Sequence, residues 1–244
     1  MLEAHIDPTR LRYYRRNLLR WFRAHGRDLP WRRTRDPYRI LVSEIMLHQT
    51  QVPRVAQVYE EFLDRFPTIE HVAHASLREV KAVTDPLGYK VRGGWIKRIA
   101  DDAVEYRAGR LPETHTELME LTGVGRYTAG AIMTFAYDRP QPIVDTNVSR
   151  VLSRWFARTL PEHDSPAERQ RRLWALASAL LPRRDGWAFN QGLMDLGAQL
   201  CTARRPACER CPMRRRCHYA RSDGGRAERS AVEWREARRA RTGR

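Results

Sequence analysis

The residues best suited to chemistry in this chain are a glycine motif and an aspartate that follows it. Residues 121–130 read LTGVGRYTAG, and Asp145 lies in the later run IVDTNV. Gly123 and Gly125 allow positive φ and leave no Cβ between the backbone and a ligand. We expect a tight turn here, followed by a helix whose first N–H groups, beside Arg126, bind phosphate. Because Asp145 adds a carboxylate near that turn, the pattern indicates chemistry on a nucleic acid.

Four cysteines near the C-terminal end form a second chemical group. The chain contains no other cysteine, and in a reducing cytosol such a group binds metal rather than forming disulfides. Four thiolates can hold a zinc ion or a [4Fe–4S] cluster. The longer spacings suit the larger cluster better than the two close pairs usual for zinc, and the arginines between the cysteines indicate a loop that binds phosphate. The cysteines are Cys201, Cys208, Cys211 and Cys217.

Composition favours a polyanionic partner. The 244 residues carry a net charge of +16, which attracts nucleic acid or an anionic membrane surface. Nearly all of this charge is arginine, so base composition of the coding sequence is an alternative reason for it. No apolar run approaches the roughly 20 residues that span a bilayer, and the N-terminus lacks a signal core. We therefore expect a monomeric cytoplasmic protein, associated with the nucleoid and without a membrane partner.

The elements that position these residues are predicted to be helices throughout. Apolar residues recur with the helical period, strand-like alternation is scarce, and no repeat has a constant length. The sequence therefore predicts an all-α fold. After residue 217 the arginine-rich tail has few large apolar residues, and we expect much of it to be mobile. The predicted helices cover residues 10–25, 40–47, 52–66, 77–83, 93–107, 114–121, 127–137, 147–156, 166–181 and 187–200.

The hairpin, Asp145 and the C-x6-C-x2-C-x5-C spacing together resemble the helix-hairpin-helix DNA glycosylases of the endonuclease III superfamily. The resemblance runs from about residue 10 to about residue 220. It is strongest to the MutY adenine glycosylases and the related thymine mismatch glycosylases. It implies two helical domains flanking a DNA-binding groove into which the target nucleotide is flipped. Residues 1–28 and 138–217 would form the iron–sulfur cluster domain, 29–137 a six-helix barrel with the hairpin, and 218–244 a basic tail.

The resemblance also assigns roles to two carboxylates. Glu44 is similar to the acid that protonates the leaving base, and burial in its apolar helix would raise its pKa to a useful range. Asp145 is similar to the carboxylate that stabilises the oxocarbenium-like sugar. The structural alternatives are a surface glutamate for Glu44 and a helix N-cap for Asp145. An N-cap would also hold the Asp145 carboxylate in place.

Tyr127 distinguishes between two activities within the resemblance. Superfamily members that also nick the strand have lysine at this position, where its amine forms a Schiff base. A phenol cannot form one, so we expect a glycosylase without lyase activity, in which Tyr127 contacts the sugar or Asp145. A packing tyrosine is the alternative. Asn147 would orient Asp145 or a water, unless it serves only as a helix cap.

Other matched positions concern the base that is removed. The wedge that probes the opposite base and fills the gap left by flipping is matched by Gln49, Leu87 and Tyr89. The positions that line an adenine pocket are matched by Trp31, Arg32 and Gln191, and the glutamine offers both a donor and an acceptor to a base edge. These matches favour a MutY-like enzyme.

Some positions depart from the MutY pattern. Lys90 stands where MutY usually has a second tyrosine, and Thr146 where it usually has glycine. Residues 31–38 resemble the thymine branch. Because 27 residues follow Cys217, we expect no domain of the kind with which MutY enzymes usually recognise 8-oxoguanine. We expect a mismatch-specific enzyme that removes adenine opposite guanine or 8-oxoguanine, with thymine or uracil opposite guanine as the alternative.

Two other classes of protein compete with an enzyme. A non-catalytic iron–sulfur DNA-binding module would need neither Glu44 nor Asp145, and a redox sensor would have no use for the glycine hairpin. The residues therefore favour the glycosylase over both.

Overall fold

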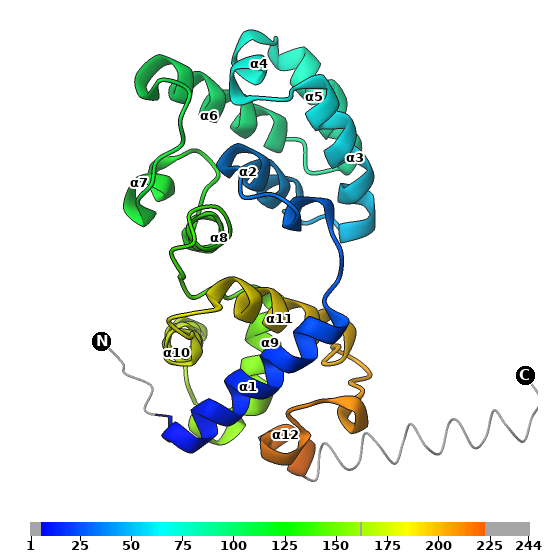
Figure 1. Cartoon of the computed structure of the whole chain (residues 1–244), viewed down its shortest axis with the longest axis vertical. Helices are drawn as coiled ribbons and strands as arrows, with labels where there is room; N and C mark the ends of the chain where they lie inside the picture. Colours follow the sequence, from blue (N-terminus) through cyan, green and yellow to red (C-terminus); the bar gives the residue numbers. More distant parts are fainter. Residues whose placement is uncertain (1–5, 162, 223–244) are drawn as a thin grey trace, which may run out of the picture. The chain divides into compact units, whose positions relative to one another are not determined.

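The computed structural model describes residues 6–161 and 163–222, and all regular elements in these ranges are α- or 3-10 helices (Figure 1). The all-α prediction is confirmed. Most of the tail predicted to be mobile lies outside the described residues. Within the described ranges, no helix is both long and apolar enough to cross a membrane. The chain divides into two compact units: unit 1 comprises Met1–Gly26 and Pro142–Arg244, and unit 2 comprises Arg27–Gln141.

Unit 1 is built around three helices. The first helix packs along α11, which in turn packs on α9, and in Figure 1 α9 and α11 lie beside the blue α1. An aromatic cluster closes the core, where the Tyr14 ring stacks on Trp155 at 4.8 Å and contacts Phe156. The helices are α1 (Pro8–His25), α9 (Thr146–Trp155), α10 (Pro166–Leu180), α11 (Gly186–Gln199) and α12 (His218–Arg221), with 3-10 turns η3 (Ala157–Thr159), η4 (Cys208–Arg210) and η5 (Arg214–Arg216).

Unit 2 surrounds one almost wholly buried helix. Eight of the ten residues of α2 are buried, as expected of a helix that is apolar all round, and it packs against α3, α6 and α8. The helices are α2 (Pro37–Met46), α3 (Val52–Arg65), α4 (Ile69–His74), α5 (Leu77–Thr84), α6 (Arg92–Arg107), α7 (His115–Glu120) and α8 (Arg126–Phe135), with 3-10 turns η1 (Pro30–Arg32) and η2 (Asp85–Leu87).

Polar caps fix where several helices begin. The Asp36 carboxylate accepts a hydrogen bond from the Tyr38 backbone N–H at the start of α2. Ser76 and Ser165 form capping boxes with the glutamates three residues later. Such caps satisfy N–H groups that have no partner within the helix. Two short helices, α4 and α12, were not predicted from the sequence.

Candidate active site

The glycine hairpin joins α7 to α8. Gly123 has φ +79°, and the Val124 N–H closes the turn by donating to the Leu121 carbonyl at 3.0 Å. A Cβ on Gly123 would lie 2.4 Å from the Trp95 ring, so both the turn and the packing require glycine. Gly125 differs from the prediction, because its φ of −99° and ψ of −178° are extended values open to any residue.

The start of α8 has the features of an anion site. Its N-cap, Gly125, has no side chain to cap the first turn, and a Cβ there would meet nothing within 4 Å. The helix dipole and the outward N–H groups favour a negative group at such an end. Arg126 is exposed at the first position and Tyr127 is half-buried at the second. The hairpin therefore brings backbone N–H groups that no N-cap side chain covers together with the positive charge of Arg126.

Glu44 lies in the interior of unit 2. Its side chain is only 3% exposed, so the prediction of a buried glutamate is confirmed over a surface one. The helix that carries it, α2, packs against α8, and in the turn just after α2 His48 Nε2 lies 3.3 Å from Thr128 Oγ1 of α8. Burial, and then the charge of Arg92, lowers the pKa of His48. Glu44 and Tyr127 therefore belong to neighbouring helices of the same unit.

Asp145 is held at the first turn of α9 in unit 1. Its Oδ1 accepts from the Val148 N–H at 2.6 Å, and its Oδ2 accepts from Asn147 Nδ2 at 3.1 Å. Asp145 is thus an N-cap, as the structural alternative stated, and its carboxylate is held by two bonds. Asn147 is fixed in turn, because its Oδ1 accepts from Arg150 Nη2 at 2.7 Å. Gly197 lets α11 approach, since a Cβ there would lie 2.8 Å from the Asn147 Cβ.

Two arginines of α9 bind the cysteine loop, and one of them links that loop to the Asp145 carboxylate. Arg150 donates to the Cys201 carbonyl at 2.7 Å and to the Gly197 carbonyl at 2.8 Å. One turn further on, Arg154 donates to the Thr202 carbonyl at 2.7 Å and reaches Cys201 Sγ at 3.4 Å. A continuous set of hydrogen bonds therefore runs from Asp145 through Asn147 and Arg150 to Cys201. Sequence reasoning missed both arginines.

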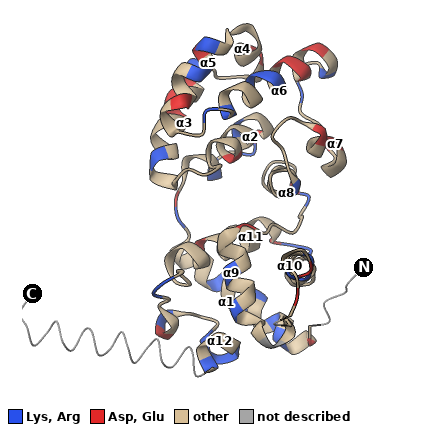
Figure 2. Cartoon of the chain, turned by 180° about the vertical axis from the view of Figure 1, so that it is seen from behind, with Lys and Arg blue, Asp and Glu red and all other residues tan. Residues whose placement is uncertain are grey.

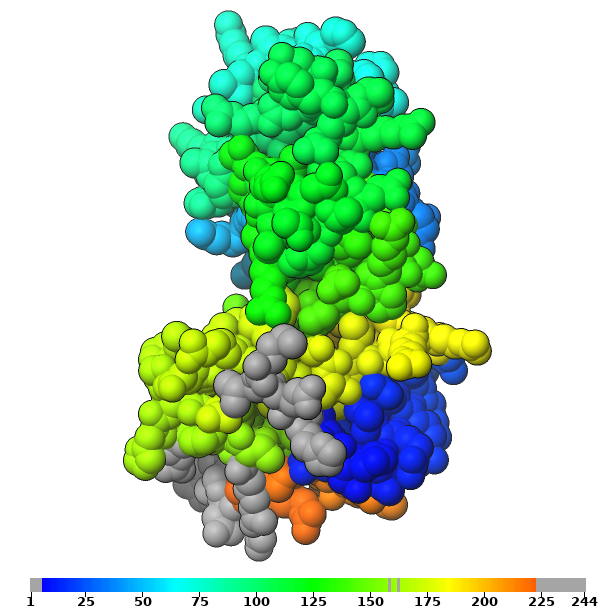
Figure 3. Space-filling view, turned by 90° about the vertical axis from the view of Figure 1, so that its left-hand side faces the viewer, coloured from blue at the N-terminus to red at the C-terminus, as the bar shows by residue number. Residues whose placement is uncertain are grey.

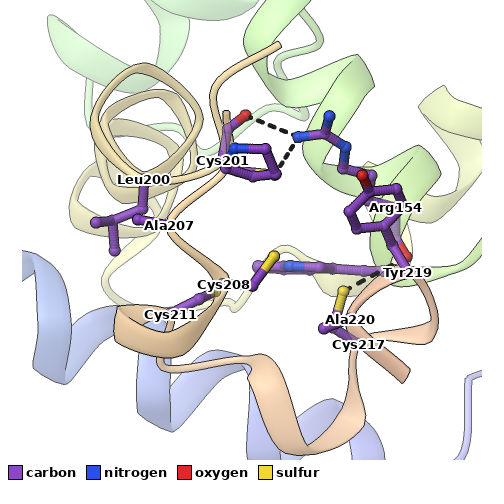
Figure 4. A pocket seen from close by; sticks show the side chains of 11 residues that line it. Arg154, Leu200, Cys201, Ala207, Cys208, Cys211, Cys217, Tyr219 and Ala220 are labelled. Carbon is purple, nitrogen blue, oxygen red and sulfur yellow. Dashed lines mark hydrogen bonds between the residues drawn. The ribbon is translucent and has the colours of Figure 1, made fainter. Parts of the chain in front are cut away.

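The four cysteines line one pocket in unit 1. Figure 4 shows their side chains around it, with Arg154 on one side and the Cys208 and Cys217 sulfurs on the other. Burial, reinforced by neighbouring thiols, raises the pKa of Cys211 to about 12 and that of Cys217 to about 11. Buried thiols this close ionise together only when a metal centre neutralises them, so the donor set fits an iron–sulfur cluster. Among the described residues, no three His, Cys, Asp or Glu side chains form a site for a single metal ion.

The predicted wedge residues lie on two loops that a buried arginine fastens together. Arg92 is completely buried and donates to the backbone carbonyls of Tyr89 at 2.9 Å and His48 at 3.0 Å, and to that of Met46. It also donates to Thr50 Oγ1 at 2.9 Å. The loop at 47–51 is thereby held against the loop at 87–91.

The wedge residues themselves differ in exposure. Gln49 is exposed and has φ +56°, a backbone region that is uncommon for residues other than glycine. The Tyr89 ring meets Trp95 edge-on at 5.6 Å. Leu87 is buried, with 4% exposure. Only Gln49 of the three is therefore exposed on the surface of unit 2.

The three residues predicted to line a base pocket fall in both units. Trp31 is buried against Tyr59, with ring centroids 5.5 Å apart, and Arg32 donates to the Arg27 carbonyl at 2.8 Å; all belong to unit 2. Gln191 is buried in α11 of unit 1.

Comparison with known proteins identifies the class to which this fold and these sites belong. Residues 42–178, more than half of the chain, match the HhH-GPD superfamily of base excision DNA repair proteins, and the chain belongs to that superfamily. Residues 201–217 match the iron–sulfur binding domain of endonuclease III. This second match confirms the predicted iron–sulfur cluster in preference to zinc.

Individual relatives fall in two groups. The adenine DNA glycosylase of Rattus norvegicus is 42% identical over 214 residues, which are 84% of this chain and 41% of the relative. The thymine/uracil-DNA glycosylase of Pyrobaculum aerophilum is 36% identical over 212 residues, 85% of this chain and 90% of the relative. The structure of a thermostable thymine-DNA glycosylase superimposes with a TM-score of 0.81 at 32% identity, covering 88% of this chain and 99% of that one. The chain thus spans about two fifths of the adenine relative's length.

Proposed function

We propose that this protein is a mismatch-specific DNA glycosylase of base excision repair that hydrolyses the N-glycosidic bond of a flipped nucleotide and leaves the strand intact. The observation that carries the proposal is Asp145, whose carboxylate is held by Val148 and Asn147 at the start of α9 in a member of a base excision repair superfamily. We further propose that it acts as a monomer on double-stranded DNA.

The chemistry assigns complementary tasks to the two carboxyl groups. Loss of the base leaves positive charge on the sugar, which the fixed Asp145 carboxylate stabilises, either electrostatically or through a transient covalent bond. Glu44 donates a proton to the departing base. Water then completes the hydrolysis. Asn147 keeps the Asp145 carboxylate oriented through its 3.1 Å hydrogen bond.

The remaining predicted residues bind DNA and hold the fold. The start of α8, with Gly123, Gly125 and Arg126, takes a backbone phosphate. The loops carrying Gln49, Leu87 and Tyr89 probe the base opposite the lesion. The four cysteines ligate a [4Fe–4S] cluster that holds the loop at 201–217 in place. This role is structural, because the loop is in turn bonded to α9 through Arg150 and Arg154.

Two bases are candidates for removal. Adenine opposite guanine or 8-oxoguanine is the leading assignment, supported by the 42% identity to an adenine glycosylase and by the matched Trp31, Arg32 and Gln191. Thymine or uracil opposite guanine is the second candidate. It is favoured by relatives of this activity that match along nearly their whole length.

The test is base release from labelled duplexes that differ in one pair. The protein, loaded with its cluster, is incubated with duplexes containing A·G, A·8-oxoguanine, T·G or U·G, and abasic sites are then cleaved with alkali. We expect cleavage of the adenine pairs. Cleavage of only T·G and U·G would select the second candidate, and cleavage of none would leave a DNA-binding module.

Tyr127→Lys is expected to convert part of the product to nicked strand without alkali. The lysine amine, at the start of α8, would attack the sugar carbon and form a Schiff base. Borohydride trapping of a covalent protein–DNA adduct measures this directly. Tyr127→Phe serves as the control, because it keeps the ring and adds no amine. If the lysine variant releases base but traps no adduct, residue 127 does not reach the sugar.

A further inference from the structure

A basic pocket in unit 1 has no part in the chemistry described above. It has a volume of about 450 Å³ and lies where α1 meets the loop before the last cysteine. In Figure 3 the blue α1 and the orange segment that ends the described chain adjoin on the surface of unit 1. The pocket is lined by Thr9, Arg12, Tyr13, Arg15, Arg16 and Arg216, with no carboxylate among them.

Three of the pocket arginines, Arg12, Arg15 and Arg16, belong to a helix with a large excess of positive charge. Helix α1 contains six arginines and no acidic residue, and the blue colour of its basic residues is visible in Figure 2. Arg12, in the second turn, is the pocket arginine nearest its N-terminus, and no acidic residue of the helix offsets its charge. A bound anion would balance this concentration of positive charge.

One of the pocket arginines is already bound to backbone carbonyls of the protein, and two others are not. Arg15 donates to the carbonyls of Ala179, Leu180 and Leu181 and so caps the end of α10. Arg12 and Arg16 are exposed, and neither joins any ion pair recorded among the described residues. Arg12 Nη2 donates to the Thr9 hydroxyl at 3.3 Å, within the pocket lining, so neither guanidinium is neutralised by a recorded carboxylate and both face a possible ligand.

Two tyrosines fix the geometry of the pocket. Tyr13 donates to the Pro212 carbonyl at 3.0 Å and Tyr14 donates to the Arg216 carbonyl at 2.8 Å, so α1 and the cysteine loop are fastened together. The Arg216 guanidinium lies 5.3 Å from the centre of the Tyr13 ring. Arginines beside a stacked aromatic ring are a common surface for the backbone and bases of nucleic-acid strands.

The pocket is separate from Asp145. The helix α9 begins at the Asp145 N-cap and ends at Trp155, on which Tyr14 stacks. Ten residues of helix span about 15 Å, so the pocket lies beyond the end of α9 opposite to Asp145. A ligand held there does not touch the reacting sugar.

We propose that this pocket is a second phosphate-binding site, which holds the phosphodiester backbone of a DNA strand through Arg12, Arg16 and Arg216. One guanidinium group can donate two parallel hydrogen bonds to two oxygens of a phosphate. The pocket volume of about 450 Å³ is large enough for more than one phosphate group. The choice of DNA as the strand rests on the proposed function, whereas the preference for a phosphate group rests on the pocket alone.

The test compares the double variant Arg12→Gln/Arg16→Gln with Arg169→Gln/Arg171→Gln, which removes the same charge from exposed positions on α10. Fluorescence anisotropy measures the affinity of each cluster-loaded protein for undamaged duplex across a range of salt concentrations. We expect the pocket variant to bind roughly tenfold more weakly at low salt and its salt slope to fall by about 2 relative to the control. Base release at saturating enzyme should be unchanged.

Three outcomes would overturn the assignment. If the pocket variant and the α10 control lose the same DNA affinity, the loss reflects the lower net charge of the protein and not a specific site. If inorganic phosphate binds to wild type and not to the pocket variant while the DNA slope is unaltered, the ligand is free phosphate. If only an acidic peptide loses affinity, the pocket receives a protein partner. Because binding to undamaged DNA needs no catalysis, failure here is distinguishable from failure of the glycosylase proposal.

Discussion

Asp145→Asn is expected to lower the rate of base release by about a thousandfold while leaving DNA affinity within a few-fold of wild type. Asparagine keeps the shape of the side chain and remains a good N-cap, so the Val148 N–H retains an acceptor and α9 keeps its first turn. The negative charge that stabilises the sugar cation is lost. Single-turnover base release and anisotropy measure the two effects separately.

The matched control is Asp36→Asn, which makes the same chemical change at the N-cap of α2. Its base release should remain near wild type, because asparagine preserves that cap and Asp36 has no role in the proposed chemistry. If Asp145→Asn lowers the melting temperature and the DNA affinity together, Asp145 is structural and the catalytic assignment is wrong. If both variants retain full activity, the carboxylate that stabilises the sugar lies elsewhere.

Features that depend on neighbours in the sequence could be predicted from it. The cysteine spacing indicated a cluster because its ligands lie within 17 residues, and Gly123 indicated a turn because few other residues adopt its φ of +79°. The long helices follow from apolar periodicity. The short helix Ile69–His74 was missed because six residues complete fewer than two turns, too few for a period to emerge.

Features that depend on distant backbone groups could not be predicted. Arg92 bonds to a carbonyl 46 positions away, and Arg150 to one 51 positions away. Every residue has a carbonyl, so the sequence holds no signal that marks these partners. The same limit applies to Gly123, whose second requirement is the Trp95 ring. The sequence therefore predicted the groups proposed to do chemistry, and tertiary packing supplied the groups that orient them.

The buried Arg92 and the half-buried Arg150 both hold loops in fixed positions, one in each unit. Arg92 binds two loops of unit 2 through neutral acceptors, and Arg150 binds the start of α9 to the cysteine loop in unit 1. Burying a charge is costly unless hydrogen bonds satisfy it, and here carbonyl oxygens supply most of them. In each case the hydrogen bonds offset the desolvation cost of the guanidinium group, and they fix the position of a loop near a proposed functional residue.

Glu44→Gln is expected to slow base release by about a hundredfold or more, since general acid catalysis contributes on the order of 10²–10⁴-fold. The side chain is 3% exposed within the packed helix α2, and glutamine fills the same volume, so the fold should persist. The glutamine amide can donate a hydrogen bond but has no acidic proton to transfer to the departing base. Glu61→Gln, at an exposed position of α3, is the matched control and should behave as wild type.

Substrates with different leaving bases distinguish proton donation by Glu44 from its other possible roles. A substrate whose base departs readily without protonation needs no acid, so with it the Glu44→Gln defect should shrink to within a few-fold of wild type. Asp145→Asn should remain slow on the same substrate, because the sugar cation still forms without its carboxylate. An equal defect of Glu44→Gln on both substrates would show that Glu44 orients the base or supports α2 and donates no proton.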